Sequence, residues 1–455
     1  MLIGRDAEIN VLSEYKRRAG NQVMIMYGLN GVGKSSLVRE FLSDNDHSLV
    51  FDCKQVFERE QLYQWSNIDD LGLDLPEYPE YIDLFNAISE HFANSNEKNV
   101  VVFDEFQYLL KYSNDFSNSL FDFLTQADKQ YFFILISSSI EWVENSMVSK
   151  IGARARGISG FFKVKELSFA DFRTYFTKFK YDECVTGYAI LGGIPKLWKY
   201  FDNTKGFKDN ILHNILDVNA PLLTYGEDFV ASELRETSVY NTILWALANG
   251  KKKLNDLYAH TQFSRAKISV YIKNLMELGF VSKEFSVDTE GRENTQKGVY
   301  DICCNFVSFS YQFLFPYRNE LQYKDATQYY NEHIRSELKK YTAKYFPAIC
   351  KEYLDTQNSL SNLPIKYDRM GSWLGKAGTI DFVCRDPGDH ILIALCNWEK
   401  PMMRFDDYEW LMYCAKQAKI TPDYVYLFSA GGFDDGLHFA VSSKKNIKLI
   451  TLDEL

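Results

Sequence analysis

The chain has 455 residues, with 51 Lys or Arg against 61 Asp or Glu, so its formal net charge is −10. Hydrophobic residues make up 46% and charged residues 25%, which excludes global disorder and predicts several domains of ~100–200 residues each. No apolar run approaches the ~18–20 residues of a bilayer span, and the N-terminus has no leader pattern, so we expect a cytoplasmic protein without membrane contact. The scattered cysteines include no CxxC motif, which argues against zinc and disulfide frameworks. An acidic chain is also a poor general coat for nucleic acid, although a local basic patch stays open.

The first chemical motif follows the apolar run Gln22–Tyr27, which predicts a buried parallel strand. The next residues, GLNGVGKS, fit the pattern G-x-x-x-x-G-K-[ST], and a helical pattern comes after them. Backbone N–H groups of such a loop surround phosphates, the lysine reaches the β- and γ-phosphates, and the serine ligates Mg²⁺. The predicted nucleotide-binding residues are Gly28, Leu29, Asn30, Gly31, Val32, Gly33, Lys34, Ser35 and Ser36.

A second strand, NVVVF at residues 99–103, ends in Asp104 and Glu105. We expect Asp104 to share Mg²⁺ with Ser35, and Glu105 to orient or deprotonate the attacking water. Buried strands often end in a solvated acidic turn, but the phosphate loop upstream makes this pair significant. The combination predicts hydrolysis as well as binding, with Lys34 and Glu105 as the catalytic candidates.

A third strand, Tyr131–Ile136, ends in three serines. Ser137 and Ser139 are candidates for sensing the γ-phosphate, because they follow a strand beside the one that carries Asp104. The alternative is a serine-rich turn without that role.

Several motifs together resemble the AAA+/STAND-type ATPases of archaea and bacteria: IGR at residues 3–5 with Glu8, the phosphate loop, VVVFDEFQYL at 100–109 and LGGIP at 191–195. The closest similarity is to the branch with a winged helix and a C-terminal domain related to nucleases. The resemblance implies that ATP is the nucleotide, that Arg5 lies near adenine, and that Pro195 contacts the base or sugar from a helical lid. It also implies a trans-acting or sensor arginine, for which Arg154 is the candidate. Ala153 stands where the family usually has arginine, so a solvated loop charge is the alternative for Arg154.

From the helix cap Ser168 to about residue 217 the pattern is helical, as a lid requires. Helices at 240–249, 254–260 and 264–278, followed by strands at 280–285 and 298–302, predict a winged helix-turn-helix. Residues 240–300 hold nine Lys or Arg and six Asp or Glu, a local net charge of 9 − 6 = +3. The candidate DNA contacts on the third helix and the wing are Arg265, Lys267, Lys273, Arg292 and Lys297. The alternative is a packing module that relays the nucleotide state.

The C-terminal part has predicted strands at 378–383, 390–395, 424–428 and 448–452 and a helix at 406–419, and it resembles the restriction-endonuclease-like PD-(D/E)XK core. That core holds metal with an Asp, a Glu-x-Lys pair and usually a helix Glu. Asp381 is present, but the Glu-x-Lys positions read Leu395-Cys396-Asn397, and the helix position falls at Pro347. We therefore expect a degenerate nuclease-like domain kept for binding or assembly. The alternative is that another carboxylate substitutes, the candidates being Glu399, Asp406 and Asp407.

The sequence thus predicts an α/β protein with four parts. These are a P-loop NTPase core (1–164), a helical lid (165–235), a winged helix-turn-helix (236–320) and a restriction-endonuclease-like α/β domain (325–455). The leading hypothesis is a Mg²⁺-dependent ATPase that acts as a molecular switch, with ATP and Mg²⁺ as cofactors. The rivals are an ATP-regulated DNA-binding protein and an ATP-dependent nuclease. The expected partners are ATP, double-stranded DNA, and a protein partner or a second copy of the chain.

Overall fold

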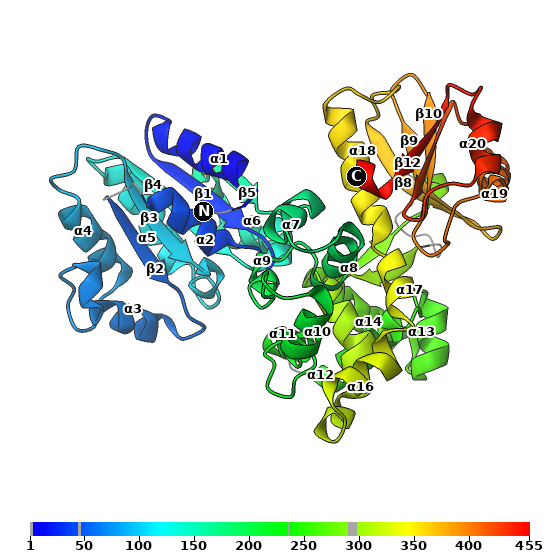
Figure 1. The fold of residues 1–455 in the computed structure, drawn as a ribbon. Coiled ribbons are helices and arrows are strands. Elements are labelled where there is room, and N and C mark those ends of the chain that lie inside the picture. The colour runs from blue at the N-terminus through cyan, green and yellow to red at the C-terminus, as the bar shows by residue number, and fades with distance from the viewer. Residues whose placement is uncertain (1–2, 44–46, 235, 290–297) are drawn as a thin grey trace. The chain divides into compact units, whose positions relative to one another are not determined.

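The computed structural model describes residues 3–43, 47–234, 236–289 and 298–455, which form two compact units (Figure 1). The first unit runs to Leu167 and also takes in Ile194–Lys196 and Glu277–Gly279. The second unit holds Ser168–Gly193, Leu197–Met276 and Phe280–Leu455. None of the helices in these described ranges is long and apolar enough to cross a bilayer.

A five-stranded parallel sheet with the order β2-β3-β4-β1-β5 forms the centre of the first unit. Its strands are β1 Gln22–Tyr27, β2 Ser48–Asp52, β3 Asn99–Asp104, β4 Tyr131–Ser137 and β5 Gly160–Lys163. The inner strands β1, β3 and β4 are almost wholly apolar, as strands buried on both faces must be. The register pairs Tyr27 with Ser137 and Asp104 with Ile136, so the carboxyl ends of these three strands meet at one edge.

Helices cover both faces of this sheet, giving a three-layer arrangement. They are α1 Asp6–Arg17, α2 Lys34–Leu42, α3 Glu58–Ser66, α4 Tyr81–His91, α5 Asp115–Gln126 and α6 Met147–Ile151. Alternate residues of β3 show the two cores: Val102 packs in the cluster with Leu37 of α2, whereas Phe103 packs in the cluster with Phe116 of α5. The Phe103 and Phe116 rings meet edge to face, with their centroids 4.9 Å apart.

The second unit begins with helices that follow the predicted pattern. They are α7 Phe169–Tyr175, α8 Tyr181–Leu191, α10 Phe207–Asn214, α11 Tyr225–Glu233, α12 Thr237–Ala248, α13 Leu254–Thr261 and α14 Arg265–Glu277, and the short α9 Pro195–Trp198 interrupts them after α8. Ser168 caps α7 as expected, because the Asp171 N–H donates to its Oγ at 3.1 Å. After α14 come the antiparallel strands β6 Val281–Glu284 and β7 Val299–Ile302, so the three helices and two strands of a winged helix are present.

Helices α15 Asn305–Phe309, α16 Ala326–Tyr329, α17 Leu338–Ala343 and α18 Phe346–Ser359 lead to a second five-stranded sheet, ordered β12-β11-β10-β9-β8. The strands and the two helices between them are β8 Arg369–Leu374, β9 Thr379–Arg385, β10 Ile391–Asn397, α19 Phe405–Gln417, β11 Tyr424–Ser429, α20 Asp435–Val441 and β12 Ile447–Thr451. The first three strands pair antiparallel, and β10, β11 and β12 pair in parallel. The four predicted strands are confirmed, whereas β8 was not predicted.

Candidate nucleotide-binding site

Three glycines shape the loop between β1 and α2. Gly31 and Gly33 have positive φ angles of 83° and 99°, which favour glycine because it has no Cβ. At Gly28 a Cβ atom would lie 2.4 Å from the carbonyl oxygen of Val164, so a side chain is excluded. The loop therefore turns tightly at the carboxyl end of β1 and ends where α2 begins.

Lys34 is the first residue of α2, and only 5% of it is exposed. Its Nζ donates to the carbonyl oxygens of Gly28 (2.8 Å) and Leu29 (3.1 Å), which keeps the ammonium inside the loop. Desolvation lowers the pKa of Lys34, while the nearby carboxylates of Glu105 and Asp104 oppose the shift. Of the other predicted loop residues, Val32 is buried, Asn30 is exposed, and Ser36 is half-buried.

Ser35 and Asp104 meet across 69 positions of sequence. The Ser35 Oγ donates to Asp104 Oδ2 at 2.6 Å. Burial raises the pKa of Asp104, and the Ser35 hydrogen bond opposes that change. The other carboxylate oxygen, Oδ1, is buried and has no hydrogen-bond partner among the described residues. A hydroxyl beside a carboxylate with a free oxygen is the type of hard-oxygen donor set that suits Mg²⁺.

Glu105 follows the end of β3 in a left-handed backbone conformation, with φ at 60°. A non-glycine residue in this region is strained by about 1–2 kcal/mol, a feature that is common at functional sites. Its Oε2 accepts hydrogen bonds from the Ser138 N–H (3.1 Å), the Ser138 Oγ (2.6 Å) and the Gln107 side-chain amide. The Glu105 carboxylate is therefore held in a fixed direction at the same sheet edge as Lys34.

The three serines at the end of β4 differ in their contacts, and the sensing role of Ser137 and Ser139 stays a prediction. Ser137 is fully buried: its carbonyl accepts from the Gly28 N–H at 3.2 Å, and its Oγ accepts from the Ser139 N–H at 3.1 Å. Ser138, which the sequence prediction passed over, contacts Glu105 instead. Successive side chains along a strand point to opposite faces, so the alternation along β4 could have indicated that Ser138 points to a different face from Ser137.

Arg5 is 97% buried beside the phosphate loop, since only 3% of it is exposed. Its Nη2 donates to the carbonyl oxygens of Val32 (2.9 Å) and Lys165 (2.8 Å), and its Nη1 pairs with Glu8 Oε1 at 2.7 Å. These contacts tie the loop to the segment after β5. Arg5 thus holds the loop backbone, and its place near adenine stays a prediction.

The segment with Pro195 also contacts the phosphate loop. The Lys196 N–H donates to the Gly31 carbonyl at 3.2 Å, and a Cβ on Gly33 would lie 3.6 Å from Pro195 Cγ. The structure therefore brings the predicted turn and the loop together within the first unit. These contacts put Pro195 beside the residues expected to hold phosphate.

Arg154 lies at the amino-terminal end of the sheet strands, whereas the phosphate loop lies at their carboxyl end. It forms a bidentate ion pair with Asp122 of α5, with N–O distances of 2.6 and 3.1 Å. It also lines a hollow with Asn21 and Val23, which stand at the amino end of β1. The structure does not bring Arg154 to the phosphate loop of its own chain.

The described basic candidates of the winged helix lie on the exposed face of α14. The Arg265 guanidinium stands 4.8 Å from the centre of the Tyr258 ring, and the Lys267 ammonium 4.4 Å from that of Phe263. Lys273 is also exposed, whereas the apolar face of the helix is buried. Arg292 and Lys297 lie outside the described residues.

Asp381 of β9 is surrounded by thiols and backbone. Its Oδ2 accepts from the Cys396 N–H at 2.7 Å, and burial raises its pKa to about 6. The alternative carboxylate Asp407 is bound to Lys400 and to the Arg404 N–H. Glu399 and Asp406 are exposed. Among the described residues, the hydrogen bonds of Asp381 thus involve no second carboxylate.

Substituting Asp381 with Asn should stabilise the protein at alkaline pH. The raised pKa means that the folded state binds more protons than the unfolded state between about pH 4 and pH 6, so the free energy of unfolding falls as pH rises through that window. An amide cannot ionise, so the variant should gain about 1–2 kcal/mol on the wild type between pH 5 and pH 8. Urea unfolding at both pH values measures this difference. The exposed Asp406→Asn is the control, and a pH-independent difference for Asp381→Asn would contradict the prediction.

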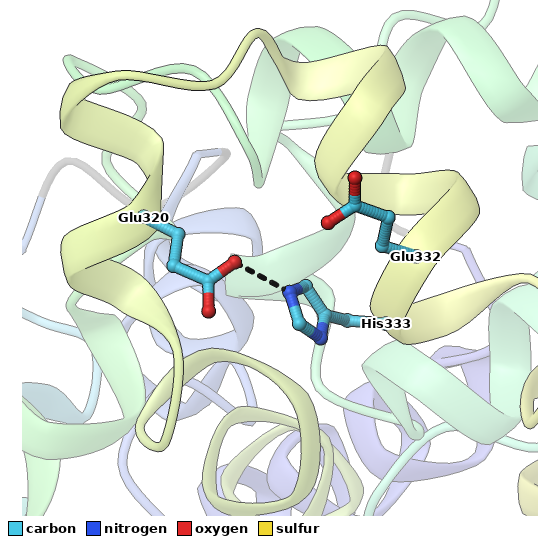
Figure 2. Close-up of side chains that lie close together, drawn as sticks. All are labelled: Glu320, Glu332 and His333. Atoms are coloured by element: carbon cyan, nitrogen blue, oxygen red, sulfur yellow. Dashed lines mark hydrogen bonds and ion pairs between the residues drawn. The ribbon is translucent and has the colours of Figure 1, made fainter.

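Glu320, Glu332 and His333 form a second acidic cluster, in the helical segments before α17 (Figure 2). It is the single group of three or more metal-type ligands found within 4.8 Å of one another in the described ranges. The His333 ring bonds to Glu320 at 2.8 Å, and Lys324 donates to both carboxylates. Lys324 already offsets part of the negative charge of the cluster, so we interpret it as a salt-bridge network that joins two helical segments. Asp381 is not part of it.

Comparisons with known proteins divide the chain into three matched segments. Residues 2–201 match a family described as "ATPase domain predominantly from Archaea". Residues 241–283 match "Bacterial regulatory protein, arsR family", and residues 310–409 match "Archaea bacterial proteins of unknown function". An uncharacterised protein of Methanocaldococcus jannaschii is 25% identical over 398 residues, which are 86% of this chain and 85% of that protein.

Two solved structures are similar to parts of this chain. A Walker-type ATPase of Pyrococcus abyssi has a TM-score of 0.47 and 19% identity, with 68% of this chain and 96% of that chain covered. The ORC2 protein of Aeropyrum pernix in ADPNP–ADP complexes has a TM-score of 0.45 and 15% identity, with coverage of 70% and 94%. By the family matches, this chain combines an archaeal-type ATPase domain, a helix-turn-helix segment of the arsR type and a C-terminal segment found in archaeal and bacterial proteins of unknown function.

Proposed function

We propose that the protein is a Mg²⁺-dependent ATP-binding and ATP-hydrolysing switch of the AAA+/STAND kind. The observation that carries this proposal is the meeting of Lys34, Ser35, Asp104 and Glu105 at the carboxyl edge of one parallel sheet. Loop N–H groups and the N-terminus of α2 bind the phosphates, and Lys34 adds a positive charge. Ser35 and the free Oδ1 of Asp104 hold Mg²⁺. When bound, Mg²⁺ supplies positive charge to the β- and γ-phosphate oxygens.

Glu105 directs the attacking water toward the γ-phosphate. Its carboxylate is fixed by Ser138 and Gln107, so little reorganisation is needed when the nucleotide binds. A carboxylate held in this direction can accept a proton from the attacking water.

Contacts within the second unit support a switch. Helix α8 ends at Leu191, three residues before the segment Ile194–Lys196 that touches the phosphate loop. Near the end of α8, the Tyr188 hydroxyl donates to Glu352 of α18 at 3.1 Å, and Glu352 also accepts from the Phe169 N–H of α7 at 2.7 Å. A displacement of the lid helices by nucleotide would therefore be transmitted to α18, which packs on the C-terminal sheet.

Titration calorimetry with ATP and ADP, in Mg²⁺ and in chelator, tests the binding half of this proposal. We expect ATP binding that Mg²⁺ strengthens by roughly tenfold or more. Equal affinity with and without Mg²⁺ would exclude the roles given to Ser35 and Asp104.

A second candidate function is ATP-regulated binding of duplex DNA, and the exposed basic face of α14 favours it. The segment matched by the arsR family covers most of α12 and all of α13 and α14. The third helix of a winged helix is the one that enters the major groove. Arg265, Lys267 and Lys273 are exposed there in a chain that is acidic as a whole. The degenerate C-terminal domain is proposed to bind or assemble and not to cleave DNA.

Reversing two charges on α14 should weaken DNA binding. The double variant Arg265→Glu with Lys267→Glu removes two phosphate contacts, so affinity for mixed-sequence duplex should fall by roughly tenfold or more. The plot of log affinity against log salt should also become shallower by about 1–2. Fluorescence anisotropy at several salt concentrations, with and without ATP, measures both.

The matched control, Lys366→Glu with Lys445→Glu, carries the same charge change at exposed sites outside the helix. If both double variants bind DNA equally, the basic face of α14 is not the contact.

A further inference from the structure

A cavity of about 460 Å³ lies at the carboxyl ends of the three parallel strands of the second unit. Residues that follow each strand line it: Trp398 and Lys400 after β10, Ala430 and Gly431 after β11, and Leu452 after β12. We call it the strand-end pocket. In open α/β sheets, ligands bind outside the carboxyl ends of the strands, and this volume is in the range of small-molecule sites.

Asn397, the last residue of β10, supports the loops after β10 and β11 that line this pocket. Its Oδ1 accepts from the Lys400 N–H at 3.0 Å, and its Nδ2 donates to Ser429 Oγ at 3.1 Å. A Cβ on Gly431 would lie 1.9 Å from the Pro401 carbonyl, so the loops after β10 and β11 approach closely only because this residue is glycine. Asn397 stands where the resemblance places the catalytic lysine of a nuclease. Here it organises a binding wall instead.

The lining is cationic. Arg335 and Lys339 are exposed side chains four positions apart in sequence, and Lys400 comes from the loop after β10. Asp182 is the one carboxylate among the lining residues, so three cations face one anion in a chain whose net charge is −10. Lys400 is shared with Asp407, which leaves Arg335 and Lys339 as the main anion-binding groups.

The rest of the lining is apolar or hydroxylic. Leu338, Pro401 and Leu452 give apolar surface, and the buried ring of Trp398 adds an aromatic wall. Thr186 and Thr342 also line this space, and their hydroxyls donate to the carbonyl oxygens of Asp182 and Leu338. An anion-binding side next to an apolar and aromatic side fits an organic phosphate better than a free inorganic ion.

We propose that the strand-end pocket binds a nucleoside monophosphate unit, with the phosphate on Arg335 and Lys339 and the base on the apolar wall. Such a unit has two sources, a free mononucleotide or the phosphorylated end of a nucleic-acid strand. The pocket is built from residues of the second unit only and shares none with the phosphate loop. The proposal therefore stands independently of ATP hydrolysis.

Calorimetry on the full chain carrying Lys34→Ala tests the pocket without the phosphate loop. The probes are AMP, adenosine, and a short single-stranded oligonucleotide with and without a 5′-phosphate, at low ionic strength. The phosphorylated probe should bind roughly tenfold or more tightly than its unphosphorylated counterpart. Adding Arg335→Glu and Lys339→Glu should reduce this binding by roughly tenfold or more.

The matched control is Lys340→Glu with Lys366→Glu, two exposed lysines outside the lining, and it should change affinity less than about twofold. Circular dichroism checks that every variant is folded. Binding of AMP supports a free nucleotide, and binding of the phosphorylated strand alone supports a strand end. Absence of phosphate-dependent binding to the Lys34→Ala protein, or an equal loss in the control, would overturn the proposal.

Discussion

Replacing Lys34 with Ala should remove Mg²⁺-dependent ATP binding, with a fall in affinity of roughly 100-fold or more. The Lys34 ammonium is the positive charge held inside the phosphate loop by the Gly28 and Leu29 carbonyls. In the variant the loop would keep its N–H groups but lose that charge. The glycine conformations that shape the loop do not depend on the lysine side chain.

Titration calorimetry with ATP in Mg²⁺ and in chelator measures this effect. The Mg²⁺-dependent part of binding belongs to the phosphate loop, and Lys34→Ala should abolish it. The control is Arg39→Ala, which removes an exposed positive charge from the same helix and should leave affinity within about twofold. Wild-type affinity in the Lys34→Ala protein would show that the nucleotide binds elsewhere.

Replacing Glu105 with Gln should leave ATP binding intact and slow turnover by roughly 100- to 1,000-fold. The amide has nearly the same size, and its oxygen can still accept the Ser138 N–H, so the local backbone should be preserved. What the variant loses is the negative charge that orients water and takes its proton. Binding and turnover should therefore separate in this protein.

Single-turnover hydrolysis and equilibrium binding, measured on the same preparation, test that separation. Glu90→Gln on α4 makes the same chemical change at an exposed site and should hydrolyse ATP at the wild-type rate. If Glu105→Gln turns over normally, another group activates the water. If it fails to bind ATP, Glu105 has a structural role at the phosphate loop.

The sequence was informative where chemistry is local. The phosphate loop and the Asp104-Glu105 pair each occupy a few consecutive residues after an apolar run, so each could be recognised from its own segment. Their meeting followed from parallel strands, whose carboxyl ends share one edge. The Ser35–Asp104 hydrogen bond at 2.6 Å is the kind of contact that this geometry predicts.

Contacts set by the tertiary structure were not predictable in the same way. The guanidinium of Arg5 bonds to Val32 and Lys165, which lie 27 and 160 positions away, and no local pattern specifies those partners. Arg154 resembled a site residue by its place after the third strand, but its partner Asp122 holds it at the other sheet edge. Which of the three serines contacts Glu105 depends on the residue at which β4 ends and on the direction of the side chain there.

Three strands were missed for related reasons. β5 has only four residues, and β2 lies at the sheet edge with Val50 exposed, so neither gives a long apolar run. β8 contains Gly371 and an irregular register between Gly371 and Trp373, which breaks its alternation. The strand-end pocket combines residues from Asp182 to Leu452 and emerges only when the chain is folded.

The most direct test of the account is phosphate release from ATP by the wild-type protein, measured with Mg²⁺ and with chelator, alone and in the presence of duplex DNA. We expect turnover that requires Mg²⁺ and that both Lys34→Ala and Glu105→Gln eliminate, with ATP binding retained only in the latter. A wild-type protein that neither binds nor hydrolyses ATP in Mg²⁺ would contradict the central claim.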